Sequence, residues 1–142
     1  MITTDEKLDK SIEEIMTKQV HTVSAGMKMI DVRQNMAKWH VRHIPVLEKK
    51  KLVGIISLTD IQRMSFSNTY GDDEMSIDDT ISDLFTAGMV MHEDPETLDI
   101  KSTVKEAAMK LSQREFHAFP VMDEDALVGI ITTTDILKFI TS

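Results

Sequence analysis

The sequence LVGIISLTDI at residues 52–61 returns almost unchanged as LVGIITTTDI at residues 127–136. Each copy begins with five apolar residues that are rich in β-branched side chains, which favours a short strand. Each then carries a hydroxyl residue followed three positions later by an aspartate, a pattern typical of a helix N-terminus. A strand that leads directly into a helix is therefore predicted twice.

The repeat extends well beyond these ten residues. A shift of 75 positions places residues 22–64 on residues 97–139 without a gap, and 11 of the 43 aligned residues are identical. Farther upstream, IEEIMT at residues 12–17 resembles ISDLFT at residues 81–86, but at a shift of 69. We therefore expect six additional residues in the second copy, in the segment around Gly88 to Pro95.

Hydrophobic periodicity predicts the order β-α-β-β-α in each copy. Apolar residues at helical spacing over 29–36 and 104–111 indicate two amphipathic helices. Strands are expected at 22–23, 44–47 and 52–56, and again at 97–98, 119–122 and 127–131. The predicted fold is α/β (α+β), with two repeats packed by pseudo-twofold symmetry and small sheets flanked by helices. We assign residues 1–66 to the first repeat with its N-terminal helix, 67–78 to an acidic linker and 79–142 to the second repeat.

Composition argues against several functional classes. The formal net charge of −8 disfavours binding to nucleic acid or to an anionic membrane. The absence of cysteine excludes disulfides and thiolate chemistry, and neither a signal peptide nor a long apolar run is present. No nucleophile elbow or P-loop occurs, and the histidines lack a recognised zinc spacing. We therefore expect a cytoplasmic protein that is not an enzyme and holds neither a metal nor a catalytic cofactor.

The two copies resemble the cystathionine-β-synthase (CBS) domain. The resemblance rests on the Pro-Val strand, the Gly-Ile-Ile-(Ser/Thr)-x-x-Asp stretch and the presence of both in tandem, and it covers roughly residues 11–140. Paired CBS domains form regulatory modules of the Bateman type, which bind AMP, ADP, ATP, S-adenosylmethionine or related nucleotides. The resemblance thus implies a ligand-sensing module that is a homodimer and acts on an effector protein not visible in this sequence.

Family analogy also implies the site residues. Asp60 and Asp135 would accept hydrogen bonds from ribose hydroxyls, and Ser57 and Thr132 would contact ribose or phosphate. The adenine pockets and the countercharge for phosphate would be formed by the remaining predicted residues: Thr22, Val23, His43, Ile44, Pro45 and Arg63 in the first copy, and Thr97, Leu98, Phe119, Pro120 and Lys138 in the second.

Three alternatives stay open at this point. Ser57 and Thr132 fit helix capping as well as ligand contact, and if they only cap helices the chain is a constitutive scaffold or dimerisation module with vestigial pockets. Phe119 fits either a pocket wall or the core. The methionines and Trp39 on the helix over 29–39, with Met109, fit either a dimer face or internal packing.

Overall fold

The computed structural model describes residues 2–67 and 84–142, with the side chains of 63–67 outside that description. The chain divides into two compact units, each of which packs mainly against itself. Unit 1 combines Met1–Val20 with Glu96–Ser142, and unit 2 is His21–Pro95. Of the predicted acidic linker, only Ser67 lies within the described residues.

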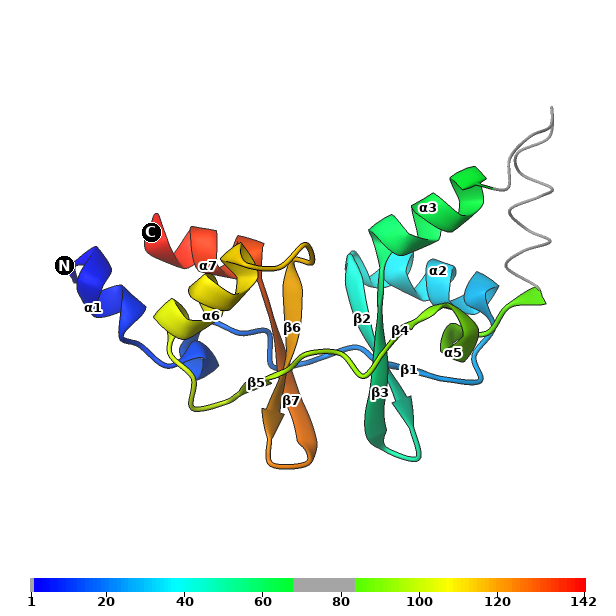
Figure 1. Ribbon diagram of the computed structural model, residues 1–142, viewed down its shortest axis with the longest axis horizontal. Helices are drawn as coiled ribbons and strands as arrows, with labels where there is room; N and C mark the ends of the chain where they lie inside the picture. The colour runs from blue at the N-terminus through cyan, green and yellow to red at the C-terminus, as the bar shows by residue number, and fades with distance from the viewer. Residues whose placement is uncertain (1, 68–83) are drawn as a thin grey trace. The chain divides into compact units, whose positions relative to one another are not determined.

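Unit 2 contains the first repeat (Figure 1). Its sheet has the strand order β1-β2-β3-β4, in which β1 and β2 are parallel and the other neighbours are antiparallel. The strands are β1 (Val23–Ser24), β2 (His43–Glu48), β3 (Lys51–Ser57) and β4 (His92–Glu93). The helices are α2 (Met29–Trp39), α3 (Leu58–Ser67) and the short α5 (Ala87–Val90).

Unit 1 contains the second repeat. Its sheet has the order β5-β6-β7, formed by β5 (Leu98–Asp99), β6 (Ala118–Asp123) and β7 (Ala126–Thr132). Helices α1 (Thr4–Leu8) and α6 (Val104–Ser112) both contact α7 (Thr133–Ile140), and the 3-10 helix η1 (Ile12–Glu14) completes the unit. The predicted order β-α-β-β-α is thus confirmed in both repeats, with small sheets flanked by helices.

The duplication is visible in the strand register. Val23 pairs with Val46 in unit 2, and Leu98 pairs with Val121 in unit 1. The hairpins also share an irregularity, which falls after Val46 in one and after Val121 in the other. Every member of these pairs is shifted by 75 residues, so the ungapped alignment of the repeats describes the fold correctly.

The predicted six-residue insertion around Gly88 is wrong. The N–H of Ile12 donates to the carbonyl of Ser102 at 2.9 Å, and the N–H of Ala87 donates to the carbonyl of Met27 at 2.8 Å. Donor and acceptor are again each shifted by 75, so η1 corresponds to α5 and no residues are inserted. The apparent shift of 69 came from side-chain similarity over six residues. Backbone hydrogen bonds decide structural equivalence, and they follow a different alignment.

Backbone hydrogen bonds also show where the segments upstream of the two repeats pack. Thr17 exchanges hydrogen bonds with Ile130 of the second repeat, whereas His92 pairs with Ile55 of the first. The segment before each repeat in the sequence therefore packs in the unit that contains the other repeat. As a result, each sheet lies next to a segment that comes from outside its own repeat.

Each unit has its own apolar core. In unit 2 the α2 methionines Met29 and Met36 are 0% and 2% exposed, so they fill the core and offer no surface for a dimer face. Trp39 is half-buried and stacks on His21, with ring centroids 4.2 Å apart. Of the four residues considered for a dimer face, only Met109 is well exposed.

Candidate functional site

The two hydroxyl–aspartate pairs lie at the starts of α3 and α7 and form reciprocal hydrogen bonds. The Asp60 N–H donates to Ser57 Oγ at 3.1 Å, and the Ser57 N–H donates to Asp60 Oδ2 at 3.4 Å. In unit 1 the Asp135 N–H donates to Thr132 Oγ1 at 3.1 Å, and the Thr132 N–H donates to Asp135 Oδ2 at 2.9 Å. Both pairs are therefore capping boxes, and helix capping is one of their roles.

Helix capping leaves both aspartates able to accept further hydrogen bonds. An ionised carboxylate has about four acceptor positions, and the capping bond occupies one of them. Both aspartates are partly exposed at a helix N-terminus, whose dipole favours an anion. The first N–H group of each helix already donates, from Leu58 to the Arg42 carbonyl at 2.7 Å and from Thr133 to the His117 carbonyl at 2.9 Å. A carboxylate that accepts from a diol, next to the positive end of a helix, is an arrangement suited to a nucleotide.

Asp60 has a further partner that sequence reasoning missed. His92 Nε2 lies 3.1 Å from Asp60 Oδ2, and 69% of the His92 side chain is exposed against 18% for Asp60. Burial disfavours the ionised carboxylate, but the hydrogen bonds from Ser57 and His92 outweigh it, so the pKa of Asp60 lies below its ordinary value. Sequence analysis considered His92 only as a metal ligand. Extending the 75-residue shift between the repeats upstream of residue 22 could have identified His92 as a residue of the site.

The equivalent position in unit 1 carries no imidazole. Thr17 exchanges backbone hydrogen bonds with Ile130, and His92 pairs with Ile55 in the same way. Ile130 is the counterpart of Ile55 at a shift of 75 residues. The residue of unit 1 that corresponds to His92 in this register is therefore Thr17. The two candidate sites share their capping box and differ in the side chain at this position.

The other predicted residues of unit 2 fall into two groups. Val23, Ile44 and Pro45 are buried, so they pack in the interior of the unit. Thr22 and His43 are half-buried and retain surface that a ligand could contact. Arg63 lies in α3, and its side chain is outside the described residues.

In unit 1 the predicted apolar wall is also buried. Leu98, Phe119 and Pro120 belong to the interior, and Phe119 is 0% exposed. The Phe119 ring packs edge-on against Phe116, with centroids 5.1 Å apart, and lies under Lys110. Packing is thus the role that the structure gives Phe119. Thr97 is half-buried and Lys138 is exposed.

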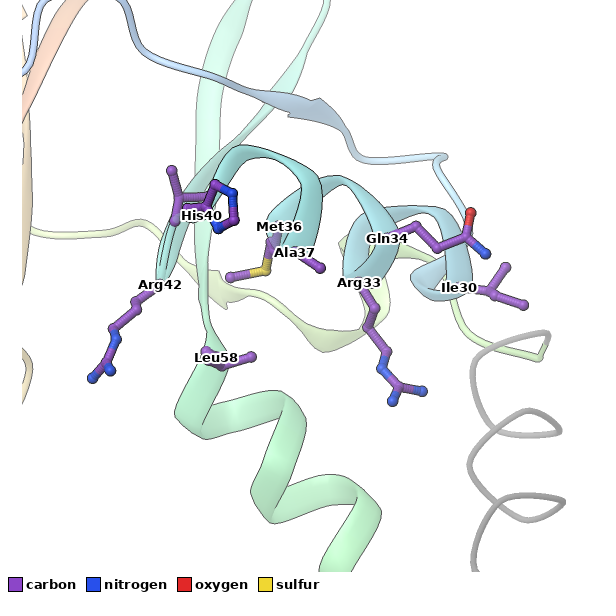
Figure 2. A pocket seen from close by; sticks show the side chains of 9 residues that line it. Ile30, Arg33, Gln34, Met36, Ala37, His40, Arg42 and Leu58 are labelled. Atoms are coloured by element: carbon purple, nitrogen blue, oxygen red, sulfur yellow. The ribbon is translucent and has the colours of Figure 1, made fainter.

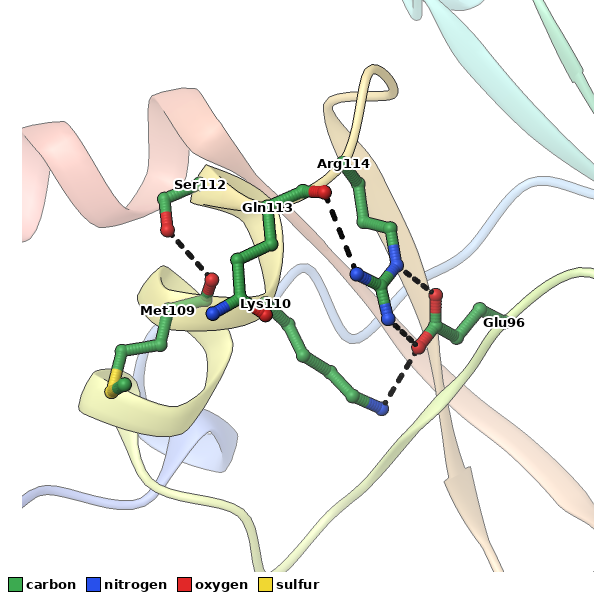
Figure 3. A network of polar contacts seen from close by, with 6 residues as sticks. All are labelled: Glu96, Met109, Lys110, Ser112, Gln113 and Arg114. Carbon is green, nitrogen blue, oxygen red and sulfur yellow. Dashed lines mark hydrogen bonds and ion pairs between the residues drawn. The ribbon is translucent and has the colours of Figure 1, made fainter.

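Arg114, a basic side chain of the second repeat, is engaged by Glu96 (Figure 3). Arg114 Nε and Nη2 donate to the two carboxylate oxygens at 2.7 and 2.9 Å, and Lys110 Nζ lies 3.3 Å from Oε1. The hydrogen bond from Arg114 is the largest cause, and with Lys110 it lowers the pKa of Glu96 from 4.5 to about 2.

This ion pair predicts a pH dependence. Because the pKa of Glu96 is lower in the folded protein, the pair contributes fully to stability above about pH 4.5, and the contribution is lost as pH falls through about 2. An NMR titration of the Glu96 carboxyl should give a pKa of about 2. Arg114→Ala should raise that pKa more than Lys110→Ala does. An ordinary pKa in the unsubstituted protein would contradict the ion pair.

A groove of about 670 Å³ lies beside α2 and the start of α3 (Figure 2). Met36, Ala37 and Leu58 give it an apolar lining, and the basic side chains are Arg33, His40 and Arg42. Of the predicted site residues whose side chains the structure describes, which excludes Arg63, none lines it. The basic side chains of His40 and Arg42, which lie between α2 and β2 in the chain, therefore face this groove.

Among residues 2–67 and 84–142, no group of three or more histidine and acidic side chains could hold a metal ion. In the same part of the chain, no helix combines the length and apolar character needed to cross a membrane.

Comparison with known proteins identifies relatives over nearly the whole chain. Residues 12–66 and 81–142 match the family model of the CBS domain. Protein MJ1225 of Methanocaldococcus jannaschii is 28% identical over 139 residues, which are 94% of this chain and 49% of that protein. L-aspartate semialdehyde sulfurtransferase of the same organism is 25% identical over 129 residues, 89% of this chain and 22% of the enzyme. The chain thus spans about half the length, or less, of these relatives.

Solved structures share the fold. The crystal structure of MJ1225 has a TM-score of 0.81 at 27% identity and is similar over 96% of this chain and 50% of that chain. The CBS domain of a CBS domain containing membrane protein from Sphaerobacter thermophilus also has a TM-score of 0.81, at 25% identity, over 96% of this chain and 91% of that chain.

Proposed function

The chain belongs to the CBS domain family, and we propose that it is a regulatory module that binds an adenosine-containing nucleotide without catalysing a reaction. One observation carries the proposal. Each unit holds a hydroxyl–aspartate pair at a helix N-terminus, and both aspartates are accessible. Such a pair offers an acceptor for a ribose diol beside donors for a phosphate.

The roles of the site residues follow from their chemistry. In unit 2, Asp60 accepts from the ribose hydroxyls, Ser57 borders the phosphate, and Thr22 and His43 contribute to the rim. In unit 1, Asp135 and Thr132 take the same roles, with Thr97 and Lys138 beside them. The positive ends of the α3 and α7 dipoles favour the phosphate. Val23, Ile44, Pro45, Leu98, Phe119 and Pro120 support these residues from the interior.

Solved structures of the same fold suggest which ligands to test. CBSX2 was crystallised in complex with AMP, and the CBS domain pair of MJ0100 with 5-methylthioadenosine and S-adenosyl-L-methionine. These proteins are 22% and 23% identical to this chain, so the likeness is one of fold. The shared chemistry of their ligands is an adenine on a ribose, and ADP and ATP extend the same class.

A second function is favoured by a different observation. Both capping boxes are complete without a ligand. A constitutive scaffold or dimerisation module would need nothing more from Ser57, Asp60, Thr132 and Asp135. The homodimer, the effector protein and the cytoplasmic location remain predictions under either function.

A thermal-shift panel separates the two functions. Protein refolded to remove carried-over ligand is heated with AMP, ADP, ATP, 5-methylthioadenosine or S-adenosylmethionine, and NAD serves as a bulkier comparison. A ligand at about 100 times its dissociation constant should add about 2.7 kcal/mol to the free energy of unfolding, which raises Tm by several degrees. A shift with one of these adenosine compounds, but not with adenine-free ribose 5-phosphate, is the expected result. No shift with any adenosine compound would favour the scaffold.

A further inference from the structure

We propose that His92 determines ligand specificity at Asp60, so that this site gains affinity for phosphorylated nucleosides as pH falls, whereas the site at Asp135 does not. The inference rests on the proposed function and assigns a selectivity to one of its two sites. It comes from the contact between His92 and Asp60 and from the difference between the repeats at this position.

The place of His92 is fixed by the backbone. β4 pairs with β3 through His92 and Ile55, and this strand approaches Gly54 closely. A Cβ atom built on Gly54 would lie 2.8 Å from the carbonyl oxygen of His92 and would also overlap the side chain of Met91. Only a glycine at this position lets β4 lie so near. That approach brings the His92 imidazole to 3.1 Å from the Asp60 carboxylate.

The exposure of His92 indicates a role beyond stability. With 69% of its side chain exposed, the imidazole can be reached by a ligand that binds at Asp60. An ion pair with so exposed a partner contributes little to folding. The carboxylate needs no histidine to cap α3, because the Asp135 box forms without one.

Histidine suits a selective role because its charge changes between about pH 5 and 8. A nucleotide whose ribose is bound to Asp60 carries its phosphate on the same sugar, within the screening length of about 8 Å at physiological salt. An imidazolium next to Asp60 therefore attracts the phosphate. Uncharged adenosine gains nothing from that attraction.

Other charges near His92 set the size of the effect. Asp60 faces it from α3, β3 presents the uncharged Ile55, and Glu93 and Asp94 follow on its own segment. His43 of β2, which pairs with Ser57, is a second imidazole at the rim of this site, and the comparison at equal pH removes its contribution. All three nearby carboxylates oppose a phosphate, and a protonated His92 offsets part of that opposition. At an effective dielectric constant of about 40, between bulk water and a typical protein surface, one charge at about 8 Å changes affinity about fivefold.

Exchanging the residues of the two repeats provides a matched test. His92→Thr installs the residue found in unit 1, and Thr17→His installs the imidazole next to Asp135. An Asp135→Ala background isolates the site at Asp60, and an Asp60→Ala background isolates the other. Isothermal titration calorimetry with AMP and with adenosine is carried out at pH 6 and pH 8. AMP itself titrates near pH 6, so each affinity is compared with that of the threonine-bearing protein at the same pH.

In the Asp135→Ala background, we compare the AMP affinity of the protein that retains His92 with that of the His92→Thr variant. The ratio of the first affinity to the second should rise about fivefold from pH 8 to pH 6. For adenosine the same ratio should stay constant. In the Asp60→Ala background, Thr17→His should create the AMP-specific rise that the unsubstituted unit 1 site lacks. Constant ratios for AMP would overturn the assignment of His92 while leaving the proposed function intact. Failure of both AMP and adenosine to bind any variant would overturn this inference, and the proposed function falls with it if ADP, ATP, 5-methylthioadenosine and S-adenosylmethionine also fail to bind.

Discussion

Phe119→Ala should lower the free energy of unfolding by about 3–5 kcal/mol. The Phe119 side chain is 0% exposed and lies in the core of unit 1 with residues from β5, α6, β7 and α7. Truncation removes its buried apolar surface and leaves a cavity that the surrounding side chains fill only in part. Urea unfolding followed by far-ultraviolet circular dichroism measures the loss as a lower midpoint at an unchanged slope.

Phe116 provides the matched control because it touches the same ring from the surface. It is 41% exposed, and its edge-on contact contributes about 0.5–1.5 kcal/mol. Phe116→Ala should therefore cost much less than Phe119→Ala. If Phe119→Ala unfolded at the urea concentration of the unsubstituted protein and only ligand binding were lost, Phe119 would be a pocket wall and its assignment to the core would be wrong.

Asp60→Ala and Asp135→Ala should each weaken nucleotide binding at their own site about 10- to 100-fold. The expected loss corresponds to one or two charge-assisted hydrogen bonds from a ribose diol, each worth about 1.5–3 kcal/mol before partial compensation by water. Calorimetry with the ligand that gives the largest thermal shift measures both the affinity and the number of sites that remain.

Asparagine variants separate binding from capping. Asp60→Asn and Asp135→Asn keep an oxygen that can accept the capping N–H but remove the charge, so helix stability should change little while affinity still falls. The alanine variants lose the cap as well, at about 1 kcal/mol. If all four variants bound nucleotide like the unsubstituted protein, the two pairs would act as caps alone, and the assignment of both aspartates to the ligand site would be wrong.

Sequence analysis predicted the elements of the fold because their causes are local. The strand and helix of LVGIISLTDI follow from β-branched side chains and a capping hydroxyl within ten residues, and β3 and α3 form there. The helix over 29–36 follows from apolar spacing, and Met29, Val32 and Met36 are buried in α2. The upstream segment was aligned wrongly because a short amphipathic turn fits more than one register.

The site was predictable only in part. The hydroxyl–aspartate pairs were found because each pair lies within one turn of helix. His92 and Asp60 are 32 residues apart, and Glu96 and Arg114 are 18 apart. Neither contact follows from spacing along the chain, and in both cases the missing information was which backbone segments lie side by side.

The sequence by itself determined that the chain is a duplicated β-α-β-β-α unit of the CBS family, with an aspartate in the helix-capping pattern of each copy. These properties depend on periodicity and on hydrogen bonds between near neighbours, so ten to forty residues suffice to encode them. Only the tertiary structure decided that the predicted apolar pocket walls lie in the core, that Asp60 has an imidazole beside it, and that the residue of the second repeat's site corresponding to this histidine is a threonine. The reason is physical: the segment before each repeat pairs with the sheet of the other. The neighbour of each aspartate is therefore fixed by long-range backbone hydrogen bonds that no local pattern specifies.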